Sequence, residues 1–333
     1  MPLSSINLSY HNLSVRFYPE DGVIADCWIG AVFRNNFLHA AREVENAQGT
    51  TLYDILSQLP FSSSHPYYKQ LCGGFPKGFV WDLSMLPHTC CDVQLERGHV
   101  YTVTLTLIGR MAEYAMPCCM AVNRFCEQGI GHPRVPLHVM DICETDGTRA
   151  QMLYNDSAGY LSEHLELPCF MGSETTGSDS CVMTLQTLTP VCLMKPRKAA
   201  TDLGYQEKLN GFPSFYQWTR SAAYRLYYLN MLYGPDARVL NLPTLDTSID
   251  EYLRKTYEAY LLRADLSYRK LYSTPKKEKS GMVYVMDGYE GMLTFKGVSS
   301  VYLPLLRFMS RLGVGNDINY GLGLYEIIEN TTI

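Results

Sequence analysis

Three polar side chains of complementary chemistry lie at helical spacing near the start of the chain. Over residues 27–43 the apolar residues follow the period of an amphipathic helix, and Asn35, His39 and Arg42 align on the opposite face. An imidazole exchanges protons near neutral pH, a guanidinium stabilises negative charge, and an amide can orient the ring. The pattern predicts an accessible proton-transfer site. Its alternative interpretation is a solvated helix face.

A second candidate site is the glycine-rich segment 313–323. Within eleven residues it holds four glycines and two asparagines, namely Gly313, Gly315, Asn316, Asn319, Gly321 and Gly323. A glycine that ends a helix adopts a positive φ at low cost, which explains one of these glycines without any ligand. The others predict a loop whose bare backbone N–H groups can approach phosphates.

The charge is distributed unevenly along the sequence, although the net charge is only −5. Residues 1–189 hold 10 basic and 19 acidic side chains, whereas residues 190–311 hold 18 basic and 11 acidic ones. The later segment is therefore the candidate surface for a polyanion. Its basic side chains include Lys276, Lys277, Arg307 and Arg311. The alternative is a solvated basic face and loop.

The elements that would position these residues occur in duplicate. A strand, a helix, a Gly-x-Gly and a further strand follow one another in residues 102–142 and again in residues 292–328, about 185 residues later. Each unit also needs an earlier strand and helix. The candidates are strands at 13–18 and 182–188 and helices at 27–43 and 215–233.

This order of elements predicts an α+β fold of two tandem ferredoxin-like modules rather than a doubly wound sheet. We assign residues 1–175 to the N-terminal module, with the candidate catalytic helix, and residues 181–333 to the C-terminal module, with the glycine-rich loop. We interpret the acidic, Gly/Ser-rich stretch 172–180 as the linker between the two modules.

Composition argues against several other classes of protein. No apolar run reaches the roughly 20 residues that a bilayer span requires, so we expect no membrane segment. Eleven cysteines, some adjacent in sequence, fit a reducing cytoplasm better than a disulfide framework. His132 and His138 come without the cysteines of a structural zinc site, so we expect no metal.

The two modules, each with a glycine-rich return, resemble the RAMP superfamily of CRISPR proteins, and specifically its repeat-RNA-processing endoribonucleases of the Cas6 type. The segments that carry the resemblance are 98–109, 129–134, 187–190, 287–291 and 312–323. The last segment is the most specific, because it follows a Leu-rich helix and precedes the final strand, as it does in that family.

The resemblance implies a metal-independent endoribonuclease that needs no cofactor. It would bind CRISPR repeat RNA and cut the precursor once, by attack of a 2′-hydroxyl, leaving a 2′,3′-cyclic phosphate and a 5′-hydroxyl. In this family the proton-transfer residue is commonly a histidine on or near the first helix, a place that only His39 occupies here, with Arg42 and Asn35 beside it. The enzyme would be cytoplasmic.

The resemblance also implies contacts and partners. The glycine-rich loop, through Gly313, Gly315, Asn316, Asn319, Gly321 and Gly323, would clamp the RNA with its backbone. Arg307, Arg311, Lys276 and Lys277 would contact phosphates. Partners besides repeat RNA and the mature guide would be CRISPR effector or adaptation proteins. The alternative function is a non-catalytic RAMP subunit that holds guide RNA inside an effector complex.

Overall fold

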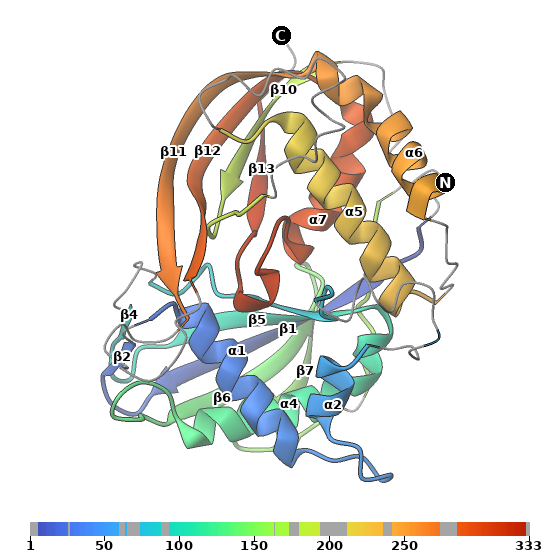
Figure 1. Ribbon diagram of the computed structural model, residues 1–333. Coiled ribbons are helices and arrows are strands. Elements are labelled where there is room, and N and C mark those ends of the chain that lie inside the picture. The colour runs from blue at the N-terminus through green and yellow to red at the C-terminus, as the bar shows by residue number, and fades with distance from the viewer. Residues whose placement is uncertain are drawn as a thin grey trace.

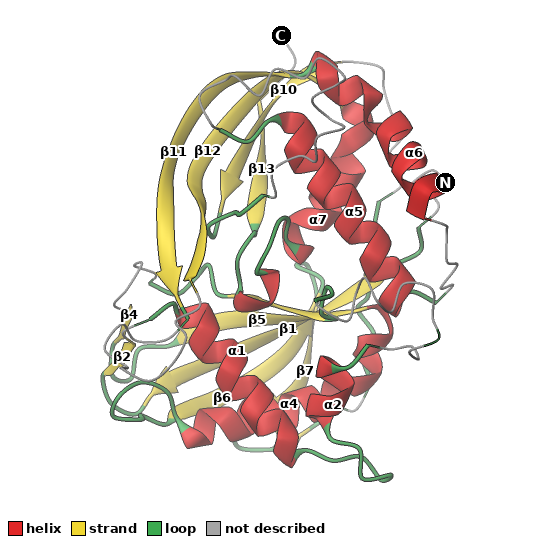
Figure 2. Cartoon of the chain, viewed as in Figure 1, coloured by secondary structure: helices red, strands yellow, loops and turns green. Residues whose placement is uncertain are grey.

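The chain folds into two antiparallel sheets, each covered by helices on one face (Figures 1 and 2). The computed structural model describes residues 6–25, 27–59, 64, 74–87, 93–162, 164–172, 180–193, 212–235, 242–273 and 285–330. None of the helices in these ranges has the length and apolar character needed to span a membrane.

The N-terminal sheet is built on a β-α-β-β-α-β unit. Its elements are β1 (Ser9–Pro19), α1 (Ile29–Ala40), β3 (Phe79–Asp82), β5 (Tyr101–Ile108), α4 (Ala115–Gln128) and β6 (Leu137–Thr145). The strand order β3-β5-β1-β6 places the first strand between the third and the fourth, as a ferredoxin-like fold requires. Further short elements are η2 (Ala41–Glu43), α2 (Leu52–Ser57), η3 (Gly109–Tyr114) and the pair β2 (Val23–Ala25) and β4 (Val93–Leu95). The strands β7 (Ala150–Asn155) and β8 (Gly159–Tyr160) extend the sheet beyond β6, and β9 (Cys169–Phe170) pairs with β1.

The C-terminal sheet repeats the same unit. It contains β10 (Ser180–Thr187), α5 (Phe215–Tyr233), β11 (Tyr260–Tyr272), β12 (Val285–Ser299), α7 (Leu303–Leu312) and β13 (Tyr325–Asn330). The order β11-β12-β10-β13 matches the N-terminal order strand for strand. The predicted fold of two tandem ferredoxin-like modules is confirmed. The remaining elements are α6 (Leu242–Tyr252), η5 (Leu253–Glu258), η6 (Ser300–Tyr302) and η7 (Ile318–Tyr320). The module limits at residues 175 and 181 stay a prediction.

Local sequence explains where the helices begin and which face they bury. The helix predicted over residues 215–233 has those limits in the structure, because Ser214 and Gln217 form a capping box before it. The helix predicted over 27–43 is α1 followed by the 3₁₀ turn η2. Its buried residues Ile29, Phe33 and Phe37 recur every four positions, so one stripe faces the core and the other face stays accessible.

The glycine-rich segment joins the two modules. The indole N–H of Trp28, just before α1, donates to the carbonyl oxygen of Tyr320 at 2.7 Å. The guanidinium of Arg34 lies 4.4 Å from the centroid of the Tyr320 ring. Elsewhere along the junction, the ring centroids of Tyr10 on β1 and Phe308 on α7 are 5.3 Å apart. The loop therefore fixes the C-terminal module against the first helix of the N-terminal one.

We expect Gly30→Ala to destabilise the protein by about 1–3 kcal/mol, because overpacking a close contact forces the backbone to move. A Cβ at Gly30 would overlap the carbonyl oxygen of Tyr320. The control is Gly22→Ala, where an added Cβ meets no heavy atom within 4 Å. Urea unfolding of the two variants measures the difference. Equal unfolding midpoints would show that the close contact between Gly30 of α1 and Tyr320 of the glycine-rich loop does not limit the stability of the protein.

Candidate functional site

The exposed face of α1 carries the three residues singled out in the sequence. Asn35, His39 and Arg42 are all exposed, while Phe33 and Phe37 on the opposite face are fully buried. The predicted alignment is thus observed, and the catalytic role of the three residues stays a prediction. A second row on the same helix, offset by one residue, contains Arg34 and Leu38.

The contacts of these side chains differ from those that the sequence suggests. Asn35 was expected to orient the imidazole, but its Oδ1 accepts a hydrogen bond from Nη1 of Arg34 at 2.8 Å. No hydrogen bond to the His39 ring occurs among the described residues. The guanidinium of Arg42 lies 4.4 Å from the centroid of the Tyr53 ring. The Tyr53 ring covers one flat face of the Arg42 guanidinium, so the edge that carries the N–H groups is the side that can bind an anion.

A carboxylate lies one turn beyond His39. Glu43 accepts hydrogen bonds from Nε of Arg124 at 2.5 Å and from Nε2 of Gln128 at 3.2 Å. The bond from Arg124 is the main cause of a lowered pKa at Glu43, and the neighbouring His39 adds to it in the same direction. Helix α4 thus holds an anionic group next to the candidate proton-transfer residue.

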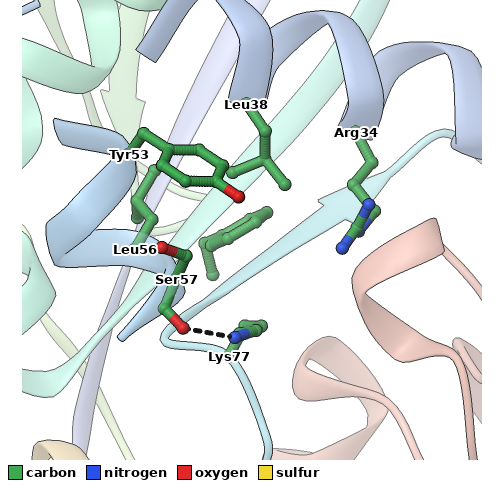
Figure 3. Close-up of a pocket in the computed structure, with 7 residues that line it drawn as sticks. Arg34, Leu38, Tyr53, Leu56, Ser57 and Lys77 are labelled. Carbon is green, nitrogen blue, oxygen red and sulfur yellow. Dashed lines mark hydrogen bonds between the residues drawn. The ribbon is translucent and has the colours of Figure 1, made fainter. Parts of the chain in front are cut away.

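A pocket of about 260 Å³ opens beside this face, between α1, α2 and the segment that leads into β3 (Figure 3). Its walls are Arg34, Leu38, Tyr53, Leu56, Ser57, Lys77 and Phe79. The ammonium of Lys77 donates to the carbonyl oxygen of Ser57 at 3.0 Å. Burial lowers the pKa of Lys77 to about 8, and the positive charge of Arg34 contributes to the shift.

The glycine-rich loop was predicted to offer bare backbone N–H groups, and in this respect the prediction was wrong. The N–H of each glycine donates within the protein: Gly313 to Met309 O, Gly315 to Ser221 Oγ, Gly321 to Ile318 O and Gly323 to Pro190 O. The φ angles of these four glycines lie between 74° and 91°, so the glycines serve the loop's own conformation. Contact of the loop with RNA stays a proposal that must use other atoms.

The other predicted RNA contacts lie on the C-terminal module. Asn316 donates its backbone N–H to Cys192 O at 2.8 Å, and Asn319 is half-buried in η7. Arg307 and Arg311 are exposed on α7. Burial raises the pKa of Tyr10 and of Cys169, and the nearby charge of Arg311 opposes both shifts, which places Arg311 at the junction with the N-terminal sheet. Lys276 and Lys277 lie outside the described residues.

Sequence reasoning missed the polar residues of the pocket, which are Arg34, Tyr53, Ser57 and Lys77. They come from separate segments, and only the fold brings them together. Arg34 carried a weak signal, since it precedes Asn35 on the polar side of a predicted helix. Among the described residues, no group of three or more His, Cys, Asp or Glu side chains is arranged to hold a metal ion.

Comparison with known proteins gives a family match for part of the chain and a similar fold for all of it. A family model described as CRISPR-associated endoribonuclease Cas6 matches residues 185–325, and another, described as an N-terminal domain, matches residues 8–166. The search of curated proteins finds no significant match.

Among solved structures, the product complex of Cas6 (TTHB231) from Thermus thermophilus is similar at a TM-score of 0.51 and 13% identity, covering 96% of this chain and 99% of that one. A Cas6-related protein from Pyrococcus furiosus gives a TM-score of 0.48 and 11% identity, covering 97% of this chain and 100% of that one. At such identities the likeness concerns the fold. Residues 185–325, in the C-terminal module, match the model of the Cas6 family of CRISPR-associated endoribonucleases, and the whole chain is similar in fold to the Cas6 structure from Thermus thermophilus.

Proposed function

We propose that this protein binds CRISPR repeat RNA and cleaves the precursor transcript once in each repeat, without a metal ion. The observation that carries the proposal is the exposed face of α1, where His39 lies next to Arg42 and close to two further cations, Arg34 and Lys77. The match of residues 185–325 to the Cas6 endoribonuclease model supports RNA processing as the general activity. The α1 face supports the particular chemistry.

The reaction needs two proton transfers and a stabilised phosphorane. The 2′-oxygen upstream of the scissile phosphate attacks phosphorus and releases its proton, the bond from phosphorus to the 5′-oxygen breaks, and that oxygen takes up a proton. The products are a 2′,3′-cyclic phosphate and a 5′-hydroxyl. His39 carries proton transfer, and the edge of the Arg42 guanidinium stabilises the added charge on the phosphorane. Asn35, held by Arg34, supplies its amide N–H groups to the same face.

The rest of the RNA would follow the junction between the modules. Arg307 and Arg311 are exposed on α7, near the start of β1, and would contact phosphates. Lys276 and Lys277 are proposed to add to this basic surface. The glycine-rich loop would contribute Asn316 and Asn319 and its carbonyl groups, since its glycine N–H groups bond within the protein.

Incubation of the purified protein with the repeat RNA of its own CRISPR locus, in EDTA, tests this function. We expect one cut per repeat, with a cyclic phosphate on the upstream product that acid converts to a monophosphate. A cut that requires a divalent metal would overturn the mechanism. Tight binding without any product would identify a non-catalytic RAMP subunit instead.

A further inference from the structure

Two positive charges converge on the pocket beside α1 without a counterion. Neither Arg34 nor Lys77 forms an ion pair with a carboxylate in the part of the chain that the structure describes. Nε of Arg34 is buried and has no hydrogen-bond acceptor among those residues. Lys77 uses one of its three N–H bonds on Ser57 O. The pocket therefore presents donors that an anionic ligand would satisfy.

Apart from Ser57, whose carbonyl oxygen accepts from Lys77, the remaining walls of the pocket are apolar or aromatic. Leu38, Leu56 and Phe79 line it together with the ring of Tyr53, whose face carries the guanidinium of Arg42. Figure 3 shows Arg34 at the right, Lys77 at the bottom next to Ser57, and Leu38, Tyr53 and Leu56 above and to the left. A cavity of about 260 Å³ admits one small group and no long chain. Its ligand must combine an anion with a flat apolar body.

We propose that this pocket binds one unpaired nucleotide of the repeat RNA, with its phosphate between Arg34 and Lys77 and its base against Leu38, Phe79 and Tyr53. The proposal rests on the proposed function. Proteins that read single-stranded RNA splay out individual bases, stack them on aromatic side chains and hold the adjoining phosphate with cations.

The place of the pocket on α1 gives it a role in positioning. Arg34 precedes Asn35, and Leu38 precedes His39, so the pocket adjoins the candidate catalytic face along the helix. A nucleotide held there would fix the register of the strand relative to the imidazole. Arg34, Leu38 and Lys77 would thus help decide which phosphodiester is cut.

The charge of Lys77 makes the contact sensitive to pH. Arg34 faces Lys77 from α1 and Tyr53 faces the pocket from α2, while the Asp54 carboxylate on α2 bonds to Thr51 and Gln58. Because burial lowers the pKa of Lys77 to about 8, the ammonium is charged below that pH and becomes neutral above it. A bound phosphate favours the charged form, so the affinity for RNA falls as the pH rises from 7 to 9.

Binding of fluorescein-labelled repeat RNA tests the pocket, with a 2′-deoxy nucleotide at the cleavage site to prevent cutting. We expect Lys77→Met and Arg34→Met each to weaken binding about tenfold. Each variant should also reduce the magnitude of the log–log salt slope by about 0.7, the value for one phosphate contact on a single strand. Lys77→Arg should keep the affinity and lose its dependence on pH, because arginine stays charged.

Arg97→Met, at an exposed arginine between β4 and β5 of the N-terminal module, is the matched control and should bind like the wild type. Thermal unfolding of each variant verifies that it is folded. If the wild type binds the repeat and Lys77→Met, Arg34→Met and the control bind equally well, the pocket proposal is overturned and the proposed function stands. If the wild type does not bind the repeat, the pocket proposal and the proposed function are both overturned.

Binding of adenosine monophosphate is a separate test. If the wild type binds it, and the variants lose that binding while keeping full RNA affinity, the pocket holds a free nucleotide and the pocket proposal is wrong.

Discussion

Replacing His39 with alanine should slow cleavage of repeat RNA by about 10²–10⁴-fold, the usual contribution of a positioned proton-transfer group. The side chain is exposed on α1 and takes part in no hydrogen bond of the described residues, so its loss leaves the packing of the helix intact. RNA affinity should stay within about twofold, because the imidazole acts on the reacting atoms rather than on the phosphate contacts. Single-turnover rates at saturating protein give the comparison.

A matched control separates proton transfer from a general effect of losing a histidine. His164 is also exposed and lies on the same module, and His164→Ala should cleave at the wild-type rate. A His39→Ala variant that cleaves as fast as His164→Ala would remove His39 from the reaction. An equally large fall in affinity and in rate would instead make His39 a binding residue.

Replacing His11 with alanine should lower the free energy of unfolding by about 3–5 kcal/mol, because it leaves a buried carboxylate without its partner. Nδ1 of His11 and Oε1 of Glu144 are 2.6 Å apart, and the two side chains are 9% and 0% exposed. The other oxygen of Glu144 accepts the backbone N–H of Glu166 at 2.8 Å. The carboxylate is therefore fixed inside the N-terminal sheet and cannot turn toward water. Urea denaturation measures the loss.

The same sheet offers a histidine–carboxylate pair at its surface as the control. Nε2 of His138 lies 3.1 Å from Oδ2 of Asp156, and the side chains are 34% and 51% exposed. Exposed pairs contribute about 0–1 kcal/mol, so His138→Ala should cost far less than His11→Ala. Similar costs for the two variants would show that burial of the Glu144 carboxylate does not set the stability of this sheet.

The sequence predicted those parts of the fold that depend on local pattern. The apolar period of residues 27–43 located the buried stripe of α1, and the helix predicted over residues 215–233 is α5. Strand β11 (Tyr260–Tyr272) escaped prediction because it lies at the edge of its sheet and is exposed along most of its length. Residues 264–269 do alternate between apolar and polar types, and Ala264 and Leu266 pack against the core. This short signal covers less than half of the strand. Its side chains Tyr260 and Tyr268 are both 51% exposed.

The candidate site was predictable only where it depends on one helix. Asn35, His39 and Arg42 share a face of α1 because of its period, which the sequence contains. Lys77 reaches the pocket beside Arg34 and Leu38 of the same helix through long-range packing, which the sequence does not display. The glycine-rich loop misled the prediction for a related reason. The acceptors of its N–H groups include Pro190 and Ser221, which lie about a hundred residues or more away in the sequence.

The proposal that an internal 2′-hydroxyl is the nucleophile has one decisive measurement. Repeat RNA with a single 2′-deoxy nucleotide upstream of the scissile phosphate is incubated with the protein in EDTA, beside the unmodified RNA. We expect the unmodified RNA to be cut once, and the modified RNA to bind with the same affinity and remain whole. Cleavage of the modified RNA at the same phosphate would contradict the mechanism, because the attacking oxygen would then come from elsewhere.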